Sequence, residues 1–290
     1  MNSVNAGSSK KVTAIFVTYQ PDIALLQRAA TSMATQVEKL CIVDNGSRCS
    51  DEIKKLCSEH AWAFIPLGEN LGIAAAYNIA FKWAESQGYC WVVTCDQDSV
   101  MPGGMISAYY AAAANLSGSE SLGIICPNFV NRSTGRQEYN IDAPTVVEKC
   151  ISSGSMTNVA AWKMVGGFDE AMFIDGVDFD FCKRLRKVGY GILLVPHICI
   201  EHEIGNATMH KILGHEFLVL NHSAFRKYYI AQNIIYMSGK YHSGRIEFIA
   251  YLKVFKQLLL VLLYEDDKWE KLASIIHGAM HGRKMLLGTE

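Results

Sequence analysis

The sequence predicts an α/β protein with a mostly parallel sheet flanked by helices. Three observations indicate this: short apolar runs rich in β-favouring residues, helix-forming segments between them, and a polar turn after each run. The apolar runs of the first hundred residues lie at 12–18, 40–43, 63–67 and 91–95. Strands that alternate with helices at this spacing are typical of a doubly wound parallel sheet.

The predicted helices between these strands have recognisable start and stop signals. Asp22 and Ser50 are side chains that can cap a helix N-terminus, and each precedes a segment with apolar residues at helical spacing. The helices are predicted at 22–36, 50–60 and 73–87.

The second half of the chain continues the pattern less regularly. Three further strand-like runs lie at 122–127, 192–195 and 198–200. A loop of small residues is predicted at 151–155, a helical segment from there to Val165, a sharp turn at Gly166-Gly167 and a basic helix at 183–189.

Polar residues follow the first four predicted strands at the point where each strand ends. These residues are Thr18, Asp44, Asn70 and Asp96. Right-handed crossovers place the carboxyl ends of successive parallel strands at the same edge of the sheet. Ligands of open α/β sheets bind at this edge, so we expect a binding site there.

The strongest candidate within that site is the pair Asp96 and Asp98, in the sequence CDQDS. Two carboxylates one residue apart are hard oxygen donors that suit Mg²⁺ or Mn²⁺, and these metals usually bind together with substrate phosphates. The alternative is an acidic turn that caps the next helix.

A second group of acids comes later in the chain. Asp175, Asp178 and Asp180 precede or open a predicted helix, where carboxylates are electrostatically favoured. They are interleaved with phenylalanines, which favour a raised carboxyl pKa and so a general base. His202 ends the last predicted strand and is either a structural histidine or a metal ligand.

Composition and missing motifs exclude several classes of protein. The net charge of −1 gives no basis for bulk nucleic-acid binding. The nine cysteines form no CxxC motif and are expected to be reduced thiols of a cytoplasmic protein. The first strand is followed by neither GxGxxG nor GxxxxGK[ST], which disfavours a Rossmann dinucleotide site and a P-loop.

Seven segments form a recognisable series along the chain. They are VTYQP at 17–21, IVDNGS at 42–47, GENLGIAAAYNIA at 68–80, CDQDS at 95–99, SGS at 153–155, GGFDEAMFIDGVDFDFCKRLRKVGY at 166–190 and HEIG at 202–205. Taken in order, these segments resemble glycosyltransferase family 2, whose members have the GT-A fold and use nucleotide-sugar donors. The CDQDS and FIDGVDFDFCKR segments are most similar to the bacterial rhamnosyltransferase branch.

The resemblance implies roles for individual residues. Asp96, Asp98 and His202 would hold the metal. Asp178 would be the general base, with Asp175 as the other candidate because Val177 stands where the family has a glutamate. The donor-binding residues would be Thr18, Tyr19, Gln20, Asp44, Asn70, Gly72, Asn78, Asp96, Gln97 and Asp98. The acceptor-side residues would be Ser153, Gly154 and Asp180.

The implied activity is an inverting transfer of a sugar to an acceptor hydroxyl. The donor would be dTDP-L-rhamnose and the acceptor a saccharide or a lipid-linked oligosaccharide of O-antigen or capsule synthesis. A UDP-hexose donor is the first alternative. A nucleotidyltransferase and a non-catalytic sugar- or nucleotide-binding protein are the rival classes.

The expected domains are a flexible tail at 1–11, a catalytic domain at 12–205 and a helical region at 206–290. No run of 18 apolar residues indicates a membrane span. The apolar helix predicted at 245–264 is expected to pack on the catalytic domain, to form a homodimer, or to contact the inner face of the cytoplasmic membrane. His277 and His281 are expected to be surface residues.

Overall fold

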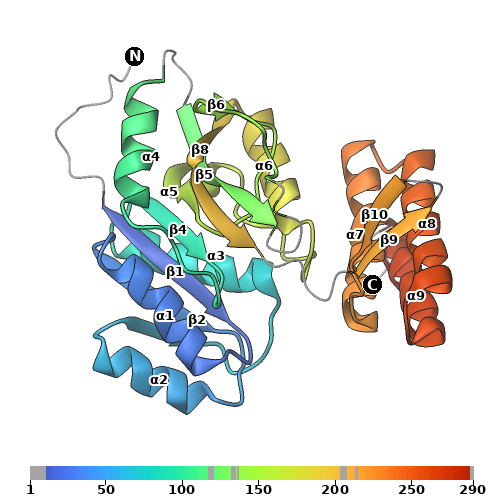
Figure 1. Ribbon diagram of the computed structural model, residues 1–290, viewed down its shortest axis with the longest axis horizontal. Helices are drawn as coiled ribbons and strands as arrows, with labels where there is room; N and C mark the ends of the chain where they lie inside the picture. The colour runs from blue at the N-terminus through green and yellow to red at the C-terminus, as the bar shows by residue number, and fades with distance from the viewer. Residues whose placement is uncertain are drawn as a thin grey trace. The chain divides into compact units, whose positions relative to one another are not determined.

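The computed structural model describes residues 11–116, 121–131, 135, 137–202, 208–212 and 215–287 (Figure 1). The chain forms two compact units. Unit 1 comprises 1–170 and 178–202, and unit 2 comprises 171–177 and 203–290. The tail expected at 1–11 lies, apart from Lys11, outside the described residues.

The described residues of unit 1 form an eight-stranded sheet in the order β3-β2-β1-β4-β7-β5-β8-β6. The strands β3, β2, β1 and β4 are all parallel, β7 is antiparallel to both of its neighbours, β8 is parallel to β5, and β6 is antiparallel to β8. Their bounds are β1 Val12–Thr18, β2 Lys39–Asp44, β3 Ala63–Pro66, β4 Trp91–Cys95, β5 Ser121–Asn131, β6 Thr145–Val146, β7 Ser155–Asn158 and β8 Tyr190–His202. The mostly parallel α/β sheet is therefore confirmed.

Helices flank this sheet. They are α1 Ile23–Ala34, α2 Ser50–Glu59, α3 Ile73–Ser86, α4 Met105–Ala114, α5 Val159–Met164 and α6 Val177–Lys187. Buried side chains of α1, α2 and α4 form one core with the strands, to which Phe16, Leu26 and Tyr109 contribute. A second, aromatic group joins α3, α5 and α6 through Phe81, Trp162, Phe168 and Phe181, with ring centroids 4.3–5.5 Å apart.

Local signals explain some element boundaries and miss others. Asp22 caps α1 as predicted, accepting a hydrogen bond from Leu25 N at 3.0 Å. Ser50 does not cap α2: it is the first helical residue, and the N-cap is Cys49, which makes no side-chain capping bond. The helix still begins there, because the acidic residues of its first turn complement the helix dipole.

Two predictions for the second half of the sheet are wrong in detail. The segment after the small-residue loop is a strand, β7, before it becomes α5, which Asn158 caps through Ala161 N (3.1 Å). The runs predicted at 192–195 and 198–200 are one strand, β8. A register shift opposite Pro127 and Asn128 accommodates Pro196, so the proline interrupts the ladder without ending the strand.

Unit 2 contains a β-hairpin and three helices among its described residues (Figure 1). They are β9 Thr208–Ile212, β10 His215–Val219, α7 Ala224–Tyr241, α8 Phe248–Tyr264 and α9 Lys268–Leu287. Helices α7 and α9 approach closely because Gly278 and Gly282 leave room for the α7 backbone. A methyl group at either glycine would overlap the carbonyl oxygen of Tyr228 or Gln232.

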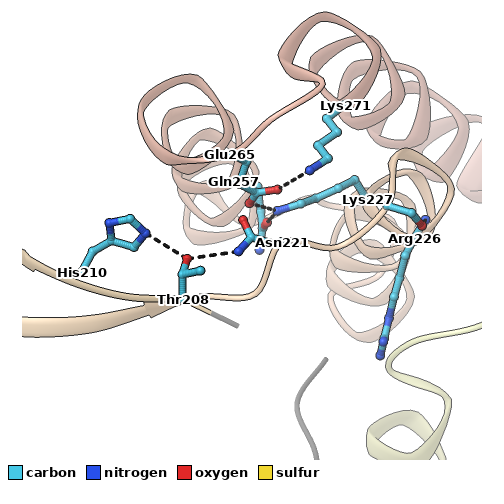
Figure 2. A network of polar contacts seen from close by, with 9 residues as sticks. Thr208, His210, Asn221, Arg226, Lys227, Gln257, Glu265 and Lys271 are labelled. Atoms are coloured by element: carbon cyan, nitrogen blue, oxygen red, sulfur yellow. Dashed lines mark hydrogen bonds and ion pairs between the residues drawn. The ribbon is translucent and has the colours of Figure 1, made fainter. Parts of the chain in front are cut away.

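A buried polar network joins the three helices of unit 2 (Figure 2). Lys227 Nζ donates to Glu265 Oε1 at 2.6 Å and to Gln257 Oε1 at 3.1 Å, and Lys271 Nζ donates to Glu265 Oε2 at 3.2 Å. All three charged side chains are almost completely buried. Because each charge has a partner, the network can persist in the interior.

Three sequence-based expectations concern the surface and the cysteines. His277 and His281 are exposed, as predicted. All nine cysteines are free thiols. Among the described helices, none has both the length and the hydrophobicity that crossing a bilayer requires.

Candidate active site

The carboxyl ends of the four parallel strands meet as the sequence predicts. Thr18 pairs with Asp44 in the register of β1 and β2, and Cys95, at the end of β4, lies opposite Phe16. Asp44 is 1% exposed. Its Oδ1 accepts hydrogen bonds from Ser47 N at 3.1 Å and Thr18 Oγ1 at 3.4 Å. Its Oδ2 is buried without a hydrogen-bond partner, so this edge of the sheet contains one acceptor that a ligand could satisfy.

The loops after β2 and β3 are joined by an asparagine pair. Asn45 Nδ2 donates to Asn70 Oδ1 at 3.0 Å, and Asn45 Oδ1 accepts from Leu71 N at 2.9 Å. Asn70 Oδ1 also accepts from Gly72 N at 3.0 Å. Gly46 permits this contact, since a Cβ there would lie 2.5 Å from the Glu69 carbonyl carbon. Asn45 was not among the predicted site residues, although its turn sequence, DNGS, could have indicated it.

The residues after β1 are hydrogen-bonded to the loops that follow both neighbouring strands. Tyr19 N donates to Gln97 Oε1 at 2.9 Å, and Gln97 Nε2 donates to Tyr19 O at 3.4 Å. Gln20 N donates to Ser47 Oγ at 2.9 Å. These bonds leave the Tyr19 ring half exposed at the edge of the sheet, where it could stack against a planar base.

Asn78 is buried in α3 and is surrounded by partners from this chain. Its Nδ2 donates to Phe168 O at 2.9 Å and to Glu170 Oε1 at 2.7 Å. Its Oδ1 accepts from Phe168 N at 2.8 Å and from Trp162 Nε1 at 3.1 Å. Asn78 therefore holds the turn at 166–170 in place and does not itself lie at the open edge of the sheet.

Asp96 and Asp178, which are 82 positions apart in the chain, lie near the same buried tyrosine. Burial raises the pKa of Tyr77 well above its ordinary value, and the negative charges of Asp96 and Asp178 raise it further. The Tyr77 hydroxyl donates to Ser152 Oγ at 3.2 Å. The end of β4 and the first turn of α6 thus converge around Tyr77. Sequence reasoning missed this residue because a tyrosine inside an apolar helix carries no distinctive signal.

The residues after β4 have the chemistry of a divalent-metal site. Asp96 is half buried and Asp98 is exposed, so both carboxylates lie at least partly at the surface beyond the end of β4. The described part of the chain has no group of three or more His, Cys, Asp or Glu side chains placed to hold a metal. The side chain of His202 lies outside the described residues. Two carboxylates fit a hard cation that takes its remaining oxygen ligands from a diphosphate and water.

The predicted acceptor-side residues lie in two different environments. Ser153 Oγ is buried without a hydrogen-bond partner, and Gly154 N donates to Thr94 O at 2.7 Å. These residues form a loop against β4. Asp180, in contrast, is completely buried and bonded to Arg184 Nε at 2.7 Å. Since Arg184 also donates to the carbonyls of the turn before α6, this pair holds α6 in place.

Asp175 belongs to unit 2 and has a different partner. Its left-handed backbone (φ 66°) is bracketed by Asn233 Nδ2, which donates to Ile174 O at 2.8 Å and Asp175 O at 2.7 Å. Its carboxylate accepts three contacts of 2.8–3.1 Å from the Arg226 guanidinium. Phe173 stacks on Tyr229 with ring centroids 4.9 Å apart. The segment 171–177 is therefore fastened to α7, which sequence reasoning missed because Arg226 lies 51 residues further along the chain.

Comparisons with known proteins agree with this geometry. The sequence model described as Glycosyl transferase family 2 matches residues 13–158. The dTDP-rhamnosyl transferase RfbF of Shigella flexneri is 30% identical over 253 residues, which cover 81% of this chain and 82% of that protein.

Solved structures share the fold at low sequence identity. The crystal structure of S. aureus TarS 1-349 superposes with a TM-score of 0.56 at 12% identity, covering 95% of this chain and 83% of that one. The structure of GalNAc-T7 with UDP, GalNAc and Mn2+ also gives 0.56 at 12% identity, covering 85% of this chain and 53% of that one. The family model and a 30% identical relative matched over 82% of its length agree, so this chain belongs to glycosyltransferase family 2.

Proposed function

We propose that this glycosyltransferase moves L-rhamnose from dTDP-L-rhamnose to a hydroxyl group of a saccharide or lipid-linked acceptor in bacterial cell-surface polysaccharide synthesis, such as O-antigen or capsule. The observation that carries the donor assignment is the similarity to the Shigella dTDP-rhamnosyl transferase over four-fifths of both chains. A UDP-hexose is the second candidate donor, because the GT-A fold also occurs in a structure that contains UDP and GalNAc.

The nucleotide would bind at the carboxyl ends of β1, β2 and β3. Asp44 Oδ2 is buried without a partner, so an N–H of the base or a hydroxyl of the ribose would satisfy it. Thr18, Tyr19 and Gln20 would line the base and ribose, and Asn70 and Gly72 would bracket the ribose and diphosphate. Gln97 and Asn78 would contribute indirectly. Gln97 would fix the Tyr19 backbone, and Asn78 would fix the turn at 166–170.

The diphosphate would lie over Asp96 and Asp98. These carboxylates, with His202 as a third candidate ligand, would hold Mg²⁺ or Mn²⁺. When bound, such an ion neutralises negative charge on the diphosphate leaving group. The accessible Asp98 and the half-buried Asp96 support this assignment.

Asp178 would be the general base. Its position in the first turn of α6 favours the ionised carboxylate. The acceptor oxygen would form a bond to the anomeric carbon while the bond to the diphosphate oxygen breaks and its electron pair leaves with the diphosphate. The acceptor proton would pass to Asp178. This single displacement inverts the configuration and gives an α-rhamnoside from a β-linked donor.

Asp175 is the less suitable base. Both oxygens of its carboxylate accept contacts from Arg226, so proton transfer to it would compete with a charge-assisted pair. We therefore assign Asp175 the task of holding the segment that leads into α6.

The donor assignment can be tested with purified protein, Mn²⁺ and a panel of dTDP- and UDP-sugars. We expect dTDP-L-rhamnose to raise the melting temperature most and to be hydrolysed slowly to dTDP without an acceptor. Greater stabilisation and hydrolysis with a UDP-hexose would refute the rhamnose assignment. Formation of a nucleoside triphosphate and a sugar 1-phosphate when pyrophosphate is added would indicate a nucleotidyltransferase. Binding without turnover of any donor, even with acceptor saccharides, would indicate a non-catalytic protein.

The reaction is proposed to take place in the cytoplasm, where a lipid-linked acceptor would be presented at the inner face of the cytoplasmic membrane. The C-terminal helices would either contact this membrane or join two copies of the chain in a homodimer.

A further inference from the structure

Helix α8 carries its largest apolar side chains on its solvent-exposed side. Six of them, with 43–75% of their surface exposed, are Phe248, Leu252, Phe255, Leu259, Leu262 and Leu263. At 3.6 residues per turn, their spacing places them along one side of the helix. On the inner side of the helix, Ala250, Val254 and Val261 are buried and, with the partly buried Leu258, pack against residues of α7 and α9. A solvent-facing apolar side of this extent marks an interaction surface.

The charges on α8 indicate what could cover this side. Lys253 and Lys256 are exposed, and the sequence from 248 to 264 contains no acidic residue. Acids occur only beyond the helix ends, at Glu247 and from Glu265 onward. The exposed apolar side is therefore accompanied by positive charge alone.

We propose that the exposed side of α8 binds the surface of an anionic phospholipid bilayer, with the helix axis in the plane of the interface. The apolar side chains would enter the acyl region to a shallow depth, and the lysine stems would extend their ammonium groups to the phosphates. The 17-residue helix is about 26 Å long at 1.5 Å per residue, shorter than the hydrocarbon core, which is consistent with an interfacial position.

A second copy of this chain is a less suitable occupant. If two α8 helices paired about a two-fold axis, each would bring two lysines and no carboxylate of its own to the contact. Lipid phosphates supply the negative charge that α8 lacks. This inference goes beyond the proposed transfer reaction and does not depend on the identity of the donor.

Vesicle flotation with the full-length protein tests the proposal without any substrate. We expect the protein to float with vesicles of phosphatidylcholine and phosphatidylglycerol, and to bind pure phosphatidylcholine more weakly. Leu252→Glu with Leu259→Glu should lower the partition coefficient by about tenfold or more per residue. Lys253→Gln with Lys256→Gln should lower it by about fivefold per lysine on the anionic vesicles only.

Met164→Glu is the control for a single glutamate, since it places one such charge on an exposed apolar residue of α5. It should bind vesicles like the wild type, and circular dichroism should show that all variants are folded. Unchanged binding by the Leu252→Glu/Leu259→Glu protein would overturn the proposal. So would a wild-type protein that ignores vesicles but is dimeric by light scattering and becomes monomeric with this double substitution, because the surface would then join two copies.

Discussion

Replacing Asp178 with Asn should separate catalysis from donor binding. Asparagine keeps the size of the side chain in the first turn of α6 and removes its ability to accept a proton. The neighbouring acids are held by other partners: Asp180 by Arg184 at 2.7 Å, and Asp175 by Arg226. Neither is placed to substitute for Asp178 without breaking its own ion pair.

The expected loss of activity equals the contribution of general-base assistance. General-base assistance typically contributes about 10²–10⁴ in rate, equivalent to about 3–5 kcal/mol in the activation barrier. Turnover by the Asp178→Asn protein should fall by at least that factor. Loss of one negative charge near Tyr77 should also bring the pKa of this tyrosine closer to its ordinary value, because the Asp178 charge contributes to raising it.

The control is Asp175→Asn. This change weakens a partly exposed ion pair worth about 1 kcal/mol or less, while the two Asn233 bonds to the backbone remain. We expect turnover within about fivefold of the wild type.

Single-turnover rates and donor affinity by calorimetry should be measured for both variants. The reasoning is refuted if Asp178→Asn keeps a tenth of the activity while Asp175→Asn abolishes it, or if Asp178→Asn loses donor binding together with activity.

Further predictions concern stability and ligands. Glu265→Gln should lower the free energy of unfolding in urea by about 3–5 kcal/mol, because Lys227 and Lys271 would stay buried without a counter-charge. A loss below about 1 kcal/mol would contradict this. Burial and then the charge of Arg226 lower the pKa of His222 from 6.5 to about 4. The unfolded chain therefore binds the proton first, and stability should decrease as pH falls from about 6.5 to 4, a slope that His222→Gln should reduce. Asp98→Ala or EDTA should abolish turnover and weaken dTDP binding in Mn²⁺, whereas full activity in EDTA would exclude the metal role.

The parallel half of the sheet was predictable because its determinants are local. Each strand from β1 to β4 is an apolar run followed by a polar turn, and the crossover rule alone brings Thr18, Asp44 and the end of β4 to one edge. The observed pairing of Thr18 with Asp44 places both residues at that edge.

The remaining features depend on contacts between distant residues. The short strand β7 has no apolar run of its own, and it exists because β4 and β5 supply partners on both sides. The family resemblance implied that Asn78 binds the donor, yet its side-chain oxygen accepts hydrogen bonds from Trp162 and Phe168, which lie at least 84 positions away. No periodicity in the sequence reports such partners.

The assignment of residues 171–177 to unit 2 affects how this protein could be dissected. A truncated chain ending after β8 would retain the sheet, yet it would leave Asp175 without Arg226, the Ile174 carbonyl without Asn233 and the Phe173 ring without Tyr229. The released segment is joined covalently to the first turn of α6, one residue before Asp178. With Asp178 as the proposed base, such a fragment would be expected to retain nucleotide binding and to lose sugar transfer.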